Sequence, residues 1–209
     1  MNDLQRTPEW YADRCGCLTA SAAAPLFAMR KDGKPTVAYY DLLDRLIAER
    51  VSGEVQGSYF NAAMQWGIDH EDDARVAYEA ATFNDVQLVG FVHHPEVPFL
   101  GASPDGLIGH DGLLEIKCPN TTTHLRRIKE GIVPPEYIPQ MIVQCLCTGR
   151  QWVDYVDFDP RCRGRFEHLA YWSIRFTPTQ EQLDDALKRC VDFLVLVEQT
   201  LEDLTGRET

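Results

Sequence analysis

Three residues near the middle of the chain, Asp105, Glu115 and Lys117, could build a metal and water site. Glu115 and Lys117 are separated by one residue in a short apolar stretch, and side chains along a strand alternate between its two faces. Their carboxylate and ammonium groups therefore project to the same side, with the main-chain carbonyl of Ile116 between them. Carboxylate oxygens suit Mg2+, and a neighbouring ammonium can orient or deprotonate a metal-bound water. Lys117 could also serve only as the counter-ion of Glu115.

The segment between these residues predicts how Asp105 reaches the other two. Gly109-His110-Asp111-Gly112 has the composition of a turn, which is typical of a β-hairpin between two apolar runs. A hairpin folds Asp105 back to within about one residue of Glu115, while the turn sequence leaves the register open. Pro104-Asp105-Gly106 alone would be ordinary turn sequence, but turn chemistry does not explain the acid and base that follow on one strand face.

A third carboxylate is predicted on the inward face of a long helix. The apolar positions of residues 59–81 recur at helical spacing, and Glu71 falls on the same face. An inward carboxylate is costly to bury unless a cation or a metal ion compensates its charge. Glu71 could therefore form a salt bridge with a buried arginine. Alternatively, it could join Asp105 and Glu115 and make room for a second metal ion.

Two further groups of polar residues could contact a ligand. Arg14 and Ser21 flank a small-residue segment near an expected helix start, where backbone N–H groups and an arginine can bind an anion. A capping serine and a surface arginine would explain them equally well. Gln140 and Gln144 share one stripe of an otherwise apolar helix. Their amides need partners, either within the core or at an active-site acid.

The bulk properties describe an ordinary globular protein and exclude some functions. With 209 residues, 44% of them hydrophobic, the chain is most simply one domain over 1–209. No apolar run reaches the roughly 18 residues of a membrane span, and the first residues lack the features of a signal peptide. We therefore expect a cytoplasmic protein without a membrane partner. The seven scattered cysteines lack zinc-ribbon spacing and favour reduced, partly buried thiols.

The net charge of −12 disfavours a protein that holds DNA through a broadly basic surface. The charge is unevenly spread, however, because residues 69–85 are strongly acidic while basic groups gather at 126–129 and 161–165. These local basic patches could contact phosphates while the rest of the surface keeps the protein soluble. The charge lowers the expectation of DNA binding without excluding it.

The expected elements alternate in a way that predicts the fold class. Helices, a cluster of strands, a helical excursion, more strands and a closing helix predict an α/β (α+β) fold with a central mixed β-sheet flanked by helices. The expected helices begin at Pro8 after an N-cap Thr7, within 19–24, at 37–51, 59–81, 121–130 and 136–147, and from Thr179 onward; the expected strands cover 86–92, 99–108, 112–117, 151–158 and 168–175.

Together these motifs resemble a known family of nucleases. Asp105 followed by Glu115-x-Lys117 matches the PD-(D/E)xK nuclease signature, which implies a restriction-endonuclease-like core. The wider chain resembles the lambda exonuclease family, also called YqaJ-type viral recombinase nucleases. The matching blocks, in family order, are Trp10 to Ser21 (W-x3-R-x-G-x2-T-A-S), Gly67-x3-Glu71-x2-Ala74-Arg75, Ser103-Pro104-Asp105-Gly106, Glu115-Ile116-Lys117-Cys118-Pro119 and Tyr137-x2-Gln140.

The resemblance implies an activity and a role for each matching residue. It implies an Mg2+-dependent exonuclease, with Mn2+ as a possible substitute, that degrades one strand of linear duplex DNA from its 5′ end. The products would be 5′-mononucleotides and a 3′ single strand for recombination. By family position, a first metal ion would lie on Asp105, Glu115 and the Ile116 carbonyl, and Glu71 would support a second; Lys117 would activate water, Gln140 would help to order the site, and Arg14, Ser21 and Ser103 would grip the 5′-terminal phosphate.

The resemblance also implies partners. Family members form a ring-shaped homotrimer around the DNA and work with a single-strand annealing recombinase. Two other functions stay open from the residues alone. The same core cuts internally in restriction or repair endonucleases, and a chain of this kind could be a non-catalytic scaffold that binds DNA ends. Retention of all three acids and Lys117 disfavours the scaffold, because DNA binding gains nothing from that cluster.

Overall fold

A five-stranded mixed sheet carries the two strands on which Asp105, Glu115 and Lys117 lie. The computed structural model describes residues 4–56 and 62–206. The sheet has the order β2 (Val86–Gln87), β5 (Gly106–Ile108), β6 (Gly112–Lys117), β7 (Trp152–Phe158) and β8 (Tyr171–Phe176). A smaller sheet has the order β1 (Leu18–Thr19), β4 (Leu100–Ala102) and β3 (Val92–His93). The expected mixed α/β fold is confirmed.

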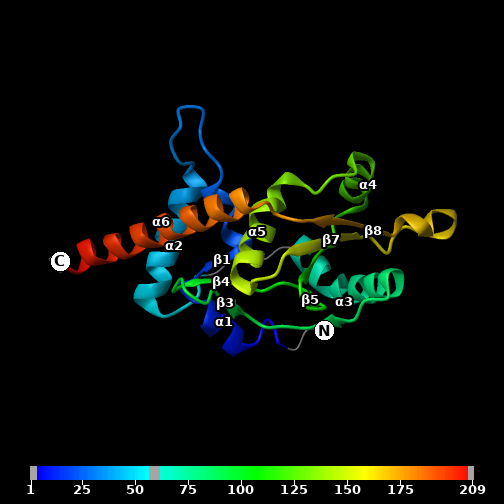
Figure 1. Cartoon of the computed structure of the whole chain (residues 1–209), viewed down its shortest axis with the longest axis horizontal. Helices are drawn as coiled ribbons and strands as arrows, with labels where there is room; N and C mark the ends of the chain where they lie inside the picture. The colour runs from blue at the N-terminus through cyan, green and yellow to red at the C-terminus, as the bar shows by residue number, and fades with distance from the viewer. Residues whose placement is uncertain (1–3, 57–61, 207–209) are drawn as a thin grey trace.

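Helices cover both faces of the larger sheet (Figure 1). β6 and β7 are parallel, so the chain must cross over between them, and it does so through α4 (Thr121–Glu130), a 3-10 turn (Pro135–Tyr137) and α5 (Ile138–Thr148). Met141 of α5 packs against Leu113 and Tyr155 on one face. On the opposite face, α3 (Ala62–Thr82) buries Tyr78 against Leu114 and Val156.

A second core joins the smaller sheet to the remaining helices. α2 (Val37–Ser52) and α6 (Gln180–Thr205) contribute Leu46 and Phe193, which pack with Leu18 of β1 and with Val143 of α5. α5 therefore lies between two cores, which explains why most of its side chains are buried. None of the helices in the described ranges is long and apolar enough to span a bilayer.

Helix ends follow the capping residues that the sequence supplies. α1 (Pro8–Arg14) begins after Thr7, whose hydroxyl accepts a hydrogen bond from the Trp10 N–H at 3.2 Å. α6 begins after Thr179, which forms a reciprocal capping box with Gln182. The expected bounds of α2, α4, α6, β6 and β7 agree with the structure to within one residue.

Several expected elements differ from the structure. The single strands expected over 86–92 and 99–108 are each divided in two, because residues 88–91 and 103–105 leave the ladders and Pro104 has no N–H to donate. The segment expected as a helix over 19–24 forms β1 and two 3-10 turns, Ala20–Ala22 and Ala24–Leu26. β8 begins after a 3-10 helix at Gly164–Leu169, and α5 begins after the 3-10 turn.

The helix expected over 59–81 is described from Ala62 onward, and its first residues lie outside the described ranges. Its inward face is shorter than the apolar pattern predicts. Ala74 and Tyr78 are buried, whereas Met64 is 43% exposed. In the first turns, Trp66 is only partly buried where it packs against this core, and Met64 faces outward.

Buried charged groups fasten α4 to β7. The two ring nitrogens of His124 contact the carboxylate of Asp157 and, at 2.6 Å, the carbonyl of Leu169. Both partners accept hydrogen bonds, so the imidazole must donate from both nitrogens and is protonated. Burial opposes this charge, but the bonds to Asp157 and Leu169 outweigh it and raise the pKa of His124. Arg127 donates to the other Asp157 oxygen at 2.7 Å, so it does not belong to the basic surface patch expected at 126–129.

This network should make stability depend on pH. A group whose pKa rises on folding stabilises the protein fully below its unfolded pKa, which is about 6.5 for histidine, and loses that contribution as the pH rises through the folded pKa. We expect His124→Gln to lower the free energy of unfolding by about 1–3 kcal/mol at pH 6 and by less at pH 9. Urea denaturation at the two pH values measures this difference.

His110→Gln, which changes an exposed residue of the β5–β6 turn, is the matched control and should leave stability unchanged at both pH values. An equal loss for His124→Gln at pH 6 and pH 9 would show that the buried ring is neutral.

Candidate active site

The β5–β6 hairpin fixes Asp105 beside Glu115. Gly106 pairs with Leu114, and the Asp105 N–H donates to the Leu114 carbonyl at 3.1 Å. The Asp105 carboxylate accepts the Ile116 N–H at 2.6 Å. Gly109 supplies the left-handed turn with φ of 50°. The expectation that the hairpin brings Asp105 to within about one residue of Glu115 is confirmed.

Two glutamine side chains of α5 hold the Glu115 carboxylate in place. Its side chain is 1% exposed, and its two oxygens accept hydrogen bonds from Gln140 Nε2 and Gln144 Nε2, each at 2.6 Å. The two glutamines are one helical turn apart and therefore reach the same group. Of the two partners that the sequence left open for these amides, the structure shows the acid. The stripe pattern pointed to both glutamines and the family resemblance gave a role only to Gln140, whereas both bind the carboxylate.

Lys117 lies on the same strand face as Glu115, as strand alternation predicts. Its ammonium pairs with Glu115 and lies 4.9 Å from the centre of the Tyr137 ring. Burial would lower the pKa of Lys117, but the neighbouring charges of Glu115 and Asp105 outweigh burial and raise it. The ammonium is therefore protonated in this state of the site.

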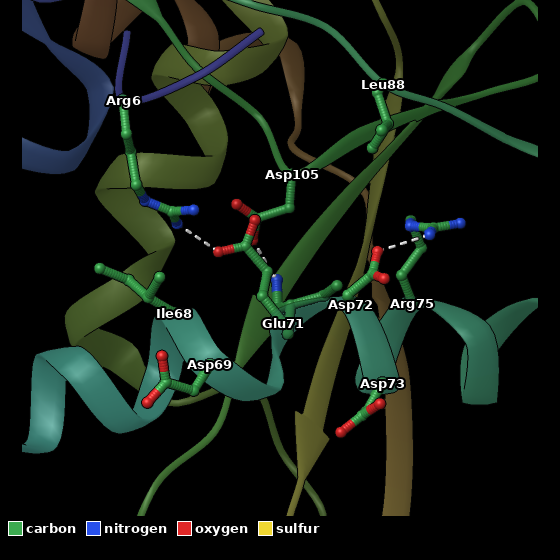
Figure 2. A pocket seen from close by; sticks show the side chains of 10 residues that line it. Arg6, Ile68, Asp69, Glu71, Asp72, Asp73, Arg75, Leu88 and Asp105 are labelled. Atoms are coloured by element: carbon green, nitrogen blue, oxygen red, sulfur yellow. Dashed lines mark hydrogen bonds and ion pairs between the residues drawn. The ribbon is translucent and has the colours of Figure 1, made fainter. Parts of the chain in front are cut away.

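Glu71 and Asp105 lie beside each other in the wall of a cavity of about 300 Å³, and Glu71 also pairs with an arginine (Figure 2). The partner is Arg6, whose guanidinium contacts the Glu71 carboxylate. Both positions that the sequence allowed for Glu71 are thus present together, in a salt bridge and beside Asp105. Arg6 was missed by sequence reasoning, since it precedes the first helix in a segment without periodicity.

The acids concentrate negative charge at this point. Burial raises the pKa of Asp105 well above its ordinary value, and the charges of Glu115 and Glu71 raise it further, while Lys117 opposes the change. Hard oxygen donors with excess negative charge fit a divalent cation such as Mg2+. No three acidic, histidine or cysteine side chains in the described ranges are placed to hold a metal ion by themselves. Glu71 and Glu115 are instead paired with Arg6 and Lys117.

A second group of polar residues lines a larger opening that the acids also line. The Ser103 hydroxyl accepts hydrogen bonds from Trp10 Nε1 at 2.9 Å and from Arg14 Nη1 at 3.1 Å. The guanidinium of Arg14 stacks 4.0 Å from the Trp10 ring centre, and burial together with Arg45 lowers its pKa to about 10. Ser21 lines the same opening. The structure therefore brings Ser103 to the opening that Arg14 and Ser21 line, although Ser103 is far from both in the sequence.

One cleft of about 870 Å³ connects this group with the acids. Its lining includes Arg14 and Ser103 as well as Asp105, Glu115 and Lys117. Arg161, one of the basic residues expected to contact phosphates, also reaches the cleft, where its guanidinium lies 4.3 Å from the Trp66 ring centre.

Comparisons with known proteins agree with this geometry. Residues 9–151 match the family model of the YqaJ-like viral recombinase domain. The chain is similar to the crystal structure of an alkaline exonuclease, LHK-Exo, from Laribacter hongkongensis, with 39% identity over 96% of this chain and 97% of that chain and a TM-score of 0.86. The structure of LHK-Exo in complex with dAMP matches with the same identity and coverage and a TM-score of 0.88.

A phage related exonuclease from Haemophilus somnus shares the fold, with a TM-score of 0.67 and 12% identity over 91% of this chain and 95% of that chain. No curated protein sequence matches the chain. The match of the family model covers more than half of the sequence and includes both the hairpin and the acids. The chain therefore belongs to the family of YqaJ-like viral recombinase domains and is a homologue of an alkaline exonuclease.

Proposed function

We propose that the whole chain, 1–209, acts as one exonuclease domain that degrades one strand of linear duplex DNA from the 5′ end. The products are 5′-mononucleotides and a 3′ single strand that serves recombination. The observation that carries this proposal is the single cleft between Arg14, Ser21 and Ser103 and the acids beside Lys117. An anion pocket joined to a hydrolytic site suits an enzyme that cuts at a fixed distance from a terminal phosphate. The complex of LHK-Exo with dAMP supports it, because that relative binds a mononucleotide.

The acids would hold the metal ions of this reaction. A first Mg2+, or Mn2+ in its place, would lie on Asp105, Glu115 and the main-chain carbonyl of Ile116, and Glu71 would support a second. When bound, such an ion lowers the pKa of a water ligand and stabilises the charge that develops on the phosphate. Gln140 and Gln144 fix the orientation of Glu115, since each donates to one of its two oxygens.

Lys117 would orient the attacking water and take its proton. The ammonium is now protonated because Glu115 and Asp105 raise its pKa. Compensation of these acids by a cation would weaken that effect and would favour the neutral amine, which can accept a proton. The Tyr137 ring beside the ammonium limits where the side chain can move.

The 5′-terminal phosphate would lie in the pocket of Arg14, Ser21 and Ser103. Trp10 and Ser103 hold the Arg14 guanidinium in place, so a phosphate meets a donor that is already oriented. The net charge of −12 leaves little general attraction for DNA. A homotrimeric ring that encloses the duplex would need fewer phosphate contacts, and we propose this assembly together with a single-strand annealing recombinase as partner.

Removal of the Lys117 amine should abolish hydrolysis without abolishing binding. We expect Lys117→Ala to release nucleotides from linear duplex in Mg2+ at least about 100-fold more slowly, because general base catalysis is lost. Band-shift titration should show DNA binding within a few-fold of the parent. Lys129→Ala, which changes an exposed lysine of α4, is the control. Digestion by Lys117→Ala at the parental rate would exclude the proposed water-activating role.

The anion pocket should make the rate depend on the chemistry of the DNA end. We expect the parent to digest 5′-phosphorylated duplex about tenfold faster than duplex with a 5′ hydroxyl, the worth of one charge-assisted hydrogen bond. Arg14→Gln should remove that preference, whereas Arg30→Gln, at an exposed arginine, should keep it. If the parent digested the two substrates at equal rates, the proposed binding of the 5′-terminal phosphate in this pocket would be wrong.

The form of the substrate separates exonuclease action from its alternatives. Covalently closed circular duplex should stay intact in Mg2+ while the same sequence, linearised, is degraded. Cutting of the circle would indicate a restriction- or repair-type endonuclease. DNA binding without cleavage of either form would indicate a scaffold that binds DNA ends.

A further inference from the structure

Residues 4–7, directly before α1, form a strap that lies on the loop carrying Asp105. The Gln5 side chain is buried, and its amide donates to the carbonyls of Val89 and Pro104, each at 3.0 Å. These two carbonyls belong to the segments that leave the strand ladders, so the amide satisfies acceptors that the sheet does not use. Gln5 therefore fixes the strap directly beside Asp105.

Arg6, the next residue, has an unusual backbone conformation. Its φ is 64°, in the left-handed region that an arginine rarely adopts. The conformation persists because Gln5 is anchored on one side and Thr7 caps α1 on the other. The turn directs the Arg6 side chain into the cavity between the strap and α3, where its guanidinium meets Glu71 (Figure 2).

The three acids of the cluster differ in how their charges are compensated. Glu115 pairs with Lys117 and Glu71 pairs with Arg6, whereas Asp105 accepts only the backbone N–H of Ile116 among the hydrogen bonds found in the described residues. The Arg6–Glu71 pair is partly open to solvent, with side chains 29% and 17% exposed. A partly exposed pair can separate without leaving a dry buried charge.

We propose that Arg6 is the resident counter-ion of Glu71 and competes with the second divalent cation for that carboxylate. The second metal position fills only when the guanidinium moves off Glu71. This inference rests on the proposed function, since it presupposes divalent ions at the cluster. It follows from charge, because a guanidinium on Glu71 uses the oxygen that the ion needs and repels the ion. Arg6 does not contact Asp105 or Glu115 in any described hydrogen bond or ion pair, so it should leave the first ion largely unaffected.

Counting of bound Mn2+ tests this competition without any DNA or turnover. Calorimetric titration with Mn2+, with free Mn2+ followed by electron paramagnetic resonance, should give one tighter and one weaker ion in the parent. In Arg6→Asn, the weaker ion should bind about tenfold more tightly, as expected for loss of one charge-assisted contact. Asparagine suits this test because it tolerates a positive φ and is too short to reach Glu71.

Three further variants make the result specific. Arg6→Gly removes the same side chain and fits φ of 64°, so it should reproduce the tighter binding if asparagine disturbs folding. Arg75→Gln removes a charge from the same cavity, but Arg75 pairs with Asp72 and Glu79 and not with Glu71. The affinity of this variant for the weaker ion should therefore equal that of the parent. In a Glu71→Gln background, Arg6→Asn should have no effect on either ion.

The outcomes separate this inference from the proposed function. Two ions that bind with the same affinities in the parent and in both Arg6 variants would overturn the competition and leave the metal centre intact. The competition would also be overturned if Arg75→Gln tightened binding of the weaker ion as much as Arg6→Asn does, or if Arg6→Asn still tightened it in the Glu71→Gln background. General electrostatics would then explain the change. If the parent binds no Mn2+, or if Asp105→Asn binds as much Mn2+ as the parent does, the metal centre and this inference are overturned together.

Discussion

Repulsion among clustered carboxylates is the constraint on which the site depends. The hairpin places Asp105 beside Glu115, and α3 adds Glu71, so three acids share a half-buried space. Like charges in such a space are unfavourable unless cations compensate them. Two of the three acids have cations from the chain itself, whereas Asp105 has none among the described residues, and burial beside the other two acids raises its pKa. The strap and the Glu115–Lys117 pair are therefore parts of one electrostatic arrangement.

The fold supplies rigidity where this arrangement needs it. α5 lies between the two cores, and its glutamines hold Glu115 by both oxygens. The buried ion pairs of Asp157 with His124 and Arg127 fasten α4 to β7, the strand beside β6. Arg127 also donates to the Tyr137 hydroxyl at 3.1 Å. The ring beside Lys117 is thus tied to a buried network. Side chains on regular elements hold their geometry more closely than side chains on loops.

The parts of the site that depend on local patterns could be predicted from the sequence. Strand alternation placed Glu115 and Lys117 on one face, and helical periodicity turned Glu71 inward. The strap could not be predicted, because the position of Arg6 depends on bonds from Gln5 to carbonyls at Val89 and Pro104, far along the chain. The break at 103–105 in the strand expected over 99–108 could not be predicted either, because the apolar residues on both sides of it form a continuous strand pattern.

The central claim is that the acids at the hairpin form a divalent-metal centre. Diffraction from crystals soaked in Mn2+ tests it most directly, because anomalous scattering locates the ion independently of any activity. The geometry predicts a peak bounded by the carboxylates of Asp105 and Glu115 and the carbonyl of Ile116. Mn2+ found only elsewhere, with these groups still paired as they are now, would contradict the claim.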